Sequence, residues 1–377
     1  MHSTAQHSTA LHCTAQHSTA QPLLYGKEQS NLIAGVAILL MLFHHFFGFP
    51  EWLKEGVGFE SLIPFDLLYN LAHFGKMCVA IFAFNTGYAM WVRQRDYTYS
   101  KIPKRIFKFL LQYWVVCLLF ILYAFIAGDA VPTARQFAWN LFGFEVSDDV
   151  VNCRHAWYVY FYVAIMLLSP ILVRLFQVKS VIVNLFLLMI FAIYTVYGRI
   201  TTSLFDGNLE FVNHVSSSVY GYLSCVFAGV LVAKYNLFLV IDRFVGRRNV
   251  FLYLALIALT IFLRQYVHIF TYGFNVDTLL VVALIYSTLA ILRNLKSRRL
   301  ERTLSVFGKY SMNMWFIHAL FHVGTLGFLQ RVLYLPNYPI LILTWGVVLV
   351  LPVAMFCSYL QGLILNLIFK PSSNKVS

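Results

Sequence analysis

The sequence predicts an all-α integral membrane protein, a bundle of about ten transmembrane helices with both termini in the cytoplasm. Of its 377 residues, 60% are hydrophobic and only 11% are charged, whereas soluble domains carry roughly 25% charged residues. The mean hydropathy is +0.72. This composition argues against a cytosolic enzyme, a disordered regulator and a DNA-binding domain. The net charge of +13 therefore indicates membrane topology rather than a nucleic-acid partner.

Ten apolar stretches are long enough to cross a bilayer, which takes about 20 residues of helix because backbone groups cannot stay unpaired in lipid. In chain order they are residues 32–49, 71–92, 107–127, 157–175, 181–197, 217–233, 250–269, 276–292, 307–329 and 339–365. The tightest connection, residues 270–275, joins the seventh and eighth stretches.

The basic residues give these spans an orientation. If both termini are cytoplasmic, 21 of the 28 Lys and Arg residues fall on the inner side and 6 on the outer side, with Lys76 inside the second span. The acidic residues divide the other way, 4 inside and 11 outside. Because a Lys/Arg excess marks cytoplasmic loops, this alternation at every loop supports ten crossings.

We expect three parts in the chain: a low-complexity, disordered tail at residues 1–26, a transmembrane domain at 27–370 and a cytoplasmic tail at 371–377. Residues 2–21 repeat a five-residue unit, HSTAQ. The tail has no apolar core of a signal peptide. Its recurring His2, His7, His12 and His17 leave a metal-binding tract as one interpretation, but no partner ligands fix a geometry, so no metal site is assigned.

The same repeat suggests a hypothesis about the gene. His-Ser-Thr-Ala-Gln can be encoded as the pentamer CACAG repeated three times. Gain or loss of one pentamer shifts the reading frame, so the repeat is consistent with phase variation of expression in a bacterium that varies its surface. Mixed synonymous codons across the tract would contradict this hypothesis.

Ionisable residues inside spans are costly and by default mark function. His44 and His45 lie near the outer end of the first span. Their side chains point about 100° apart on a helix, so the two rings cannot do the same job. Histidine titrates near neutral pH and suits a general base. Lys76 lies about one turn inside the second span.

Other polar residues have simpler interpretations. His73, Arg264 and His268 end spans, where their polar groups could reach water, and His322 could bond to a neighbouring helix. The basic segment 93–108 either sets topology or binds an anion.

Several segments resemble the membrane-bound acyltransferase 3 family, and together they run from about residue 27 to 370. Asn31 to His45 resembles its opening helix, in which a basic residue precedes an essential histidine by eleven positions. Here His45 matches and Ala34 occupies the basic position, so Lys76 or Lys27 is a candidate for the missing charge.

Four further segments resemble later helices of that family. They are Thr86-Gly87 at the end of an aromatic segment, Lys104-Arg105 with Lys108, Trp157 with Ser169-Pro170, and Gly308 with Ser311 and His318.

The resemblance implies transfer of an acyl group, usually acetyl, from cytoplasmic acetyl-CoA to a hydroxyl of a surface glycan such as lipopolysaccharide, capsule or a lipid-linked oligosaccharide. It also implies a multi-pass protein of the bacterial inner membrane, surrounded by lipid. The outer loops, especially residues 129–155, would shape the acceptor site. The alternative is a polysaccharide or small-solute transporter, although the two halves show no convincing repeat.

Under the enzyme interpretation each candidate has a role. His45 is the general base or a transient acyl carrier, His44 is its possible substitute, and Lys76 stabilises the oxyanion. The expected substrate-binding residues are Thr86, Trp157, Ser311 and His318. The expected ligands of the CoA phosphates are Lys104, Arg105 and Lys108.

Overall fold

The computed structural model describes residues 25–127, 133–134, 137–138, 141–142, 157–204, 210–245, 249–270, 275–322 and 327–369. Every regular element in these ranges is helical. The amino-terminal repeat, with its metal-tract and disorder interpretations, lies outside the described residues. So do most of the loop at 129–155 and the side chain of His268.

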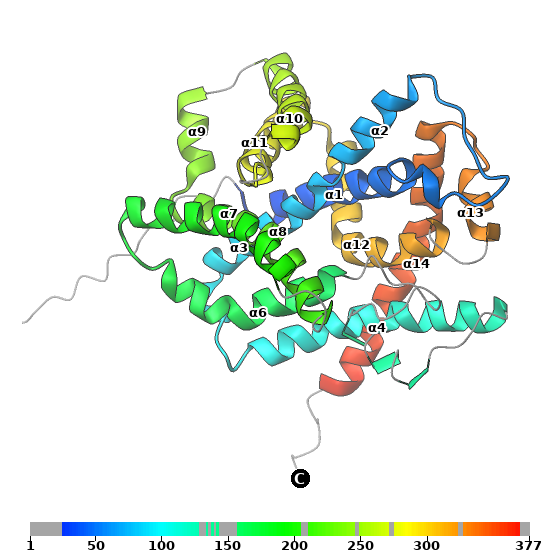
Figure 1. Cartoon of the computed structure of the whole chain (residues 1–377), viewed down its shortest axis with the longest axis horizontal. Helices are drawn as coiled ribbons and strands as arrows, with labels where there is room; N and C mark the ends of the chain where they lie inside the picture. Colours follow the sequence, from blue (N-terminus) through cyan, green and yellow to red (C-terminus); the bar gives the residue numbers. More distant parts are fainter. Residues whose placement is uncertain are drawn as a thin grey trace, which may run out of the picture.

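Figure 1 shows the helices as an irregular bundle in which segments distant in sequence lie side by side. In chain order they are α1 (Lys27–Phe47), η1 (Pro50–Trp52), α2 (Phe65–Phe74), α3 (Met77–Val92), η2 (Gln94–Asp96), α4 (Ile102–Ala127), α6 (Trp157–Leu175), α7 (Val181–Leu204), α8 (Glu210–Lys234), α9 (Leu237–Val245), α10 (Val250–Phe270), α11 (Asp277–Leu295), α12 (Arg298–His322), α13 (Gly327–Tyr334) and α14 (Pro339–Phe369).

Each of the ten predicted stretches overlaps one of these helices. Among the described residues, six helical segments are long and apolar enough to cross a membrane, namely α1, α2 with α3, α4, α6, α11 and α14. The bent pairs α8–α9 and α12–α13 raise the number to eight, and the apolar parts of α7 and α10 that are described are shorter. The protein is therefore all-helical with six to eight candidate spans, and ten crossings with cytoplasmic termini stay a prediction.

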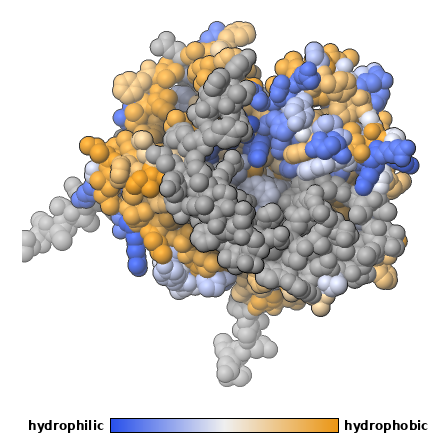
Figure 2. All heavy atoms as spheres, viewed as in Figure 1, coloured by the Kyte–Doolittle hydropathy of each residue, from blue (hydrophilic) through white to orange (hydrophobic). Residues whose placement is uncertain are grey.

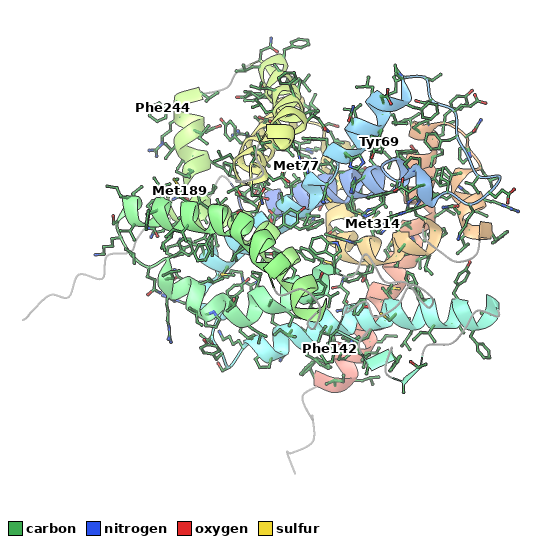
Figure 3. All side chains as sticks on the ribbon, viewed as in Figure 1. Tyr69, Met77, Phe142, Met189, Phe244 and Met314 are labelled. Carbon is green, nitrogen blue, oxygen red and sulfur yellow. The ribbon has the colours of Figure 1, made fainter. Side chains whose placement is uncertain are left out.

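The outer surface of the bundle is apolar, as expected for helices that face lipid. Met77 and Met314 lie in the interior, whereas Met189 and Phe244 point outward and are exposed (Figure 3). Hydrophobic residues make up much of the coloured part of the surface in Figure 2, and hydrophilic residues gather at its upper right, over α2 and the segment before it. That segment, residues 48–64, carries Glu51, Lys54 and other exposed polar residues.

Helices α1 and α12 approach each other so closely that glycine is needed on both. A methyl group at Gly35 would lie 2.1 Å from the carbonyl oxygen of Leu304, and one at Gly308 would lie 1.9 Å from that of Asn31. Asn31 Nδ2 also donates to the carbonyl oxygen of Ser305 at 2.8 Å. This backbone contact fixes the two helices that carry most of the candidate site.

Two chain segments differ from the prediction. The described residues of the ninth stretch belong to two helices: α12, described as far as His322, and the short helix α13, which begins at Gly327 and is sharply bent relative to α12. Tyr25, which the sequence assigns to the disordered tail, is buried against Phe84, Tyr88 and Phe238. A large aromatic ring gains free energy by leaving water, so the ordered domain begins slightly earlier than expected.

Candidate active site

A break between α2 and α3 shapes one side of the site. The backbone at Gly75 and Lys76 stays near helical, yet Lys76 N–H bonds to His73 and Gly75 N–H to Ala72, a tighter pattern than that of an α-helix. The carbonyl oxygens of Ala72 and His73 also accept bonds from side chains of other helices. Lys76 thus lies at the break with an exposed side chain, within the candidate span Phe65–Val92.

His44 and His45 occupy different surroundings, as their spacing predicted. His44 is 5% exposed, and its Nδ1 donates to the carbonyl oxygen of Ala72 at 2.9 Å. His45 is only partly buried, and its ring centroid lies 4.6 Å from that of His318 on α12. His44 therefore joins α1 to α2, while His45 faces the neighbouring helix across the α1–α12 contact.

Backbone carbonyls determine the tautomers of the facing rings. Nδ1 of His45 lies 3.1 Å from the carbonyl oxygen of Met41, and Nδ1 of His318 contacts that of Trp315. A carbonyl oxygen only accepts, so each neutral ring carries its proton on Nδ1 and its lone pair on Nε2. Both rings are thus held in the form in which Nε2 accepts a proton.

Three more histidines extend this pair into a cluster. The ring of His73 lies 5.6 Å from that of His44. His322, one turn beyond His318, is fully buried, with Nδ1 3.3 Å from the hydroxyl of Tyr334. The cluster thus consists of His44, His45, His73, His318 and His322. Among the described residues no group of three or more His, Cys, Asp or Glu side chains has an arrangement suited to a metal ion.

Two aromatic rings cover the cluster beyond the end of α1. Phe49 stacks on Trp52 with ring centroids 4.0 Å apart, and Phe49 also lies 5.9 Å from His45. Trp52 in turn lies 5.8 Å from His322. These rings shield the imidazoles from bulk water on the side of the hydrophilic segment 48–64.

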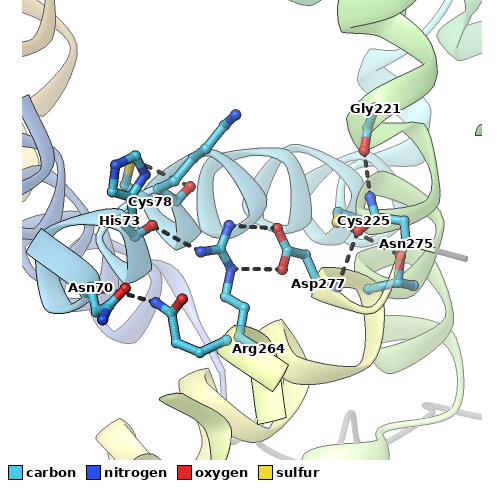
Figure 4. Close-up of polar contacts among 11 residues, drawn as sticks. Asn70, His73, Cys78, Gly221, Cys225, Arg264, Asn275 and Asp277 are labelled. Carbon is cyan, nitrogen blue, oxygen red and sulfur yellow. Dashed lines mark hydrogen bonds and ion pairs between the residues drawn. The ribbon is translucent and has the colours of Figure 1, made fainter. Parts of the chain in front are cut away.

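The sequence suggested that Arg264 is an interfacial residue whose polar end reaches water, but the structure places it in the interior. It is 8% exposed, and its guanidinium makes two bonds to the carboxylate of Asp277, at 2.9 and 3.3 Å. A third bond, 2.8 Å long, runs to the carbonyl oxygen of His73 (Figure 4). A buried charge requires a partner, and Asp277 in the first turn of α11 supplies it. The ion pair therefore ties α10 and α11 to the α2–α3 break.

Two of the predicted substrate-binding residues, Thr86 and Ser311, use their hydroxyls in hydrogen bonds within their own helices. The hydroxyl of Thr86 donates to Phe82 of its own helix at 2.9 Å, and that of Ser311 donates to Gly308 at 2.9 Å. Ser311 lies two turns from His318, about 10 Å along the axis. Trp157 lies closer to the histidines, because its ring is 6.5 Å from that of Trp315, which precedes His318 by three residues.

The basic segment lies at the start of α4. Lys104 and Lys108 are exposed, with the ammonium of Lys104 4.5 Å from the ring centre of Phe369. Arg105 is partly buried, stacks on Tyr97 and donates to its hydroxyl at 2.9 Å. Burial raises the pKa of Tyr97, so its hydroxyl stays protonated. The three basic residues are thus together, apart from the histidine cluster.

The structure also distinguishes between Lys27 and Lys76, the two lysines that could supply the positive charge missing at Ala34. Lys27 is exposed at the start of α1, eighteen residues before His45, which corresponds to about 27 Å of helix. Lys76 lies four residues after Ala72, whose carbonyl oxygen accepts the bond from His44. Of the two lysines, Lys76 is therefore the one beside the histidines.

The sequence analysis missed Gln330 and Tyr334, because its ninth stretch ends at residue 329 and leaves both in the loop that follows. Gln330 is buried, accepts from Lys54 N–H at 2.7 Å and donates to the carbonyl oxygens of Trp52 and His322. The hydroxyl of Tyr334 donates to the carbonyl oxygen of Phe46. The available signal was a Gln and a Tyr four residues apart, which share a helix face. Only tertiary contact reveals their link to the site.

Comparison with known proteins gives one finding. A family model described as an acyltransferase domain, of the acyltransferase 3 type, matches residues 29–360. No curated protein and no solved structure matches the chain significantly. The matched range contains all the residues of the histidine cluster and of the basic segment.

Proposed function

Because the chain belongs to the acyltransferase 3 family, a family whose activity is acyl transfer at the membrane, we propose that it moves an acetyl group from cytoplasmic acetyl-CoA to a hydroxyl of a surface glycan. The observation that carries this proposal is the facing pair His45 and His318, with ring centroids 4.6 Å apart. Lipopolysaccharide, capsule and lipid-linked oligosaccharide are the acceptor classes.

His45 is the general base of the proposed reaction. Its Nε2 removes the proton of the acceptor hydroxyl, whose oxygen attacks the thioester carbon. The tetrahedral adduct then collapses, and the CoA thiolate leaves and takes the proton from the imidazolium. Proton transfer of this kind contributes about 10²–10⁴-fold to rate. Partial exposure of His45, against the deep burial of His44 and His318, favours His45 as the ring that touches substrate.

The neighbouring side chains position this base. The bond from His44 to Ala72 holds α1 against the α2–α3 break. The fully buried His318 packs against the partly exposed His45. Lys76, beside His44, supplies positive charge to the site, although its exposed side chain supports a general electrostatic role better than direct contact with an oxyanion.

Arg105, with Lys104 and Lys108, provides the binding region for the CoA phosphates. Arg105 is held by Tyr97, and guanidinium and ammonium groups bind phosphate strongly. Packed aromatic rings connect this region with the histidines: Tyr162 on α6 lies 4.1 Å from Phe109 on α4, and Tyr158, one turn earlier on α6, lies 4.8 Å from Trp315. Trp315 in turn contacts His318.

Paired variants of the two adjacent histidines test this function. Cells lacking the gene are complemented with the wild type, His45→Gln or His44→Gln, and the surface polysaccharide is analysed by NMR. We expect His45→Gln to remove acetylation at normal membrane levels and His44→Gln to lower it partly. Full acetylation with His45→Gln would refute the catalytic role. Loss of the polymer itself, rather than of its acetyl groups, in cells without the gene would identify a transporter.

A further inference from the structure

Trp315 contains a buried polar group that the fold does not use. Its side chain is 1% exposed, and its indole Nε1 has no hydrogen-bond partner among the described residues. Trp114 and Trp345, by contrast, donate to the carbonyl oxygens of Leu141 and Val332 at 2.7 and 2.9 Å. Because burying an N–H without an acceptor is unfavourable, this group needs an explanation.

The position of Trp315 in the site supplies that explanation. It precedes His318 by three residues and therefore lies on the same face of α12. Its own carbonyl oxygen fixes the tautomer of His318, whose ring faces His45. Side chains on a helix lean toward its amino terminus, so the indole lies on the side of the histidine pair away from His322.

The indole is also held rigidly. Its ring lies 5.2 Å from that of Phe82, 4.8 Å from that of Tyr158 and 6.5 Å from that of Trp157. Packing on several sides restricts its rotation, so the N–H points in a fixed direction before any substrate arrives. A preorganised donor in a water-poor site is the kind of group that stabilises negative charge developing on oxygen.

We propose that Trp315 Nε1–H is the oxyanion donor of the acyl-transfer reaction, an inference that rests on the proposed function. When the acceptor oxygen attacks the thioester carbon, the π electrons of the carbonyl group move to its oxygen, and Nε1–H donates to that oxyanion. When the carbonyl bond re-forms, the C–S bond breaks and the hydrogen bond weakens again. The indole keeps its proton throughout.

Trp315→Phe tests the inference, with Trp345→Phe as the matched control. Both changes remove an indole N–H and a similar volume, but only the Trp345 N–H has an acceptor in the fold. We expect Trp315→Phe to lower kcat for acyl transfer by about 10²–10³-fold with little change in the donor KM. Trp345→Phe should keep kcat and lower the melting temperature more, because it also breaks a hydrogen bond.

A second variant separates the N–H from the shape of the ring. Trp315→benzothienylalanine keeps the bicyclic ring and replaces N–H by sulfur, so it should lose activity as Trp315→Phe does, while its melting temperature rises slightly because a buried donor without an acceptor is removed. Wild-type kcat in this isostere would overturn the inference. A purified wild-type protein that transfers no acyl group would overturn the proposed function first, whereas an active wild type with a fully active isostere overturns the donor role alone.

Discussion

The close contact between α1 and α12 makes Gly35→Ala the most informative single substitution. The added methyl would meet the Leu304 carbonyl oxygen at 2.1 Å, while real contacts of this kind essentially never fall below 3.0 Å. Because the obstacle is backbone, the helices must separate by roughly 1 Å. Overpacking of this size costs about 1–3 kcal/mol, and the better helix propensity of alanine returns about 1 kcal/mol.

The functional effect should exceed the effect on stability. His45 and His318 lie on the same two helices, about 15 Å along their axes from the glycine contact. A displacement of about 1 Å can cost on the order of 100-fold in rate. We therefore expect Gly35→Ala to lower kcat 10-fold to 100-fold and the free energy of unfolding by no more than about 2 kcal/mol.

Acyl transfer in purified membranes and thermal unfolding in detergent measure both quantities. Gly362→Ala in α14 is the control, since nothing lies within 4 Å of the added methyl, and it should leave activity unchanged. Gly308→Ala should behave like Gly35→Ala. Wild-type kcat and melting temperature in Gly35→Ala would refute the view that this contact sets the spacing of the histidine pair.

Two further predictions concern residues outside that contact. Arg264→Met leaves the partly buried carboxylate of Asp277 without its partner and should cost about 3 kcal/mol of stability. Most of this loss should be recovered in Arg264→Met/Asp277→Leu, and equal losses in the single and double variants would contradict the reasoning. Tyr97→Phe removes the hydroxyl that accepts from Arg105 and should raise the donor KM several-fold at unchanged kcat. Because burial raises the pKa of Tyr97, its hydroxyl stays protonated at mildly alkaline pH. The ratio of the donor KM of Tyr97→Phe to that of the wild type, measured by steady-state kinetics, should therefore be the same at neutral and mildly alkaline pH. A ratio that falls to one at alkaline pH would contradict a protonated hydroxyl.

The sequence was sufficient to assign the helical class and the membrane environment. Apolar runs of membrane length can satisfy their backbone groups only as helices, so each predicted stretch overlaps an observed helix. It was also sufficient to single out His44 and His45 as unlike neighbours, because adjacent positions diverge around a helix. The family resemblance, which rests on short sequence motifs, singled out His318 and the basic segment in the same way.

Tertiary structure alone decided which of these residues meet. The partner of Arg264 is Asp277, thirteen residues away across a helix connection, and periodicity cannot show that a charge at a span end is buried rather than hydrated. Likewise, the ring that His45 faces belongs to a helix more than 250 residues later. The Trp315 N–H becomes notable only when the packed structure shows that no described neighbour accepts its hydrogen bond. Composition and spacing act along one chain segment, whereas contact, burial and hydrogen-bond satisfaction depend on segments that only packing brings together.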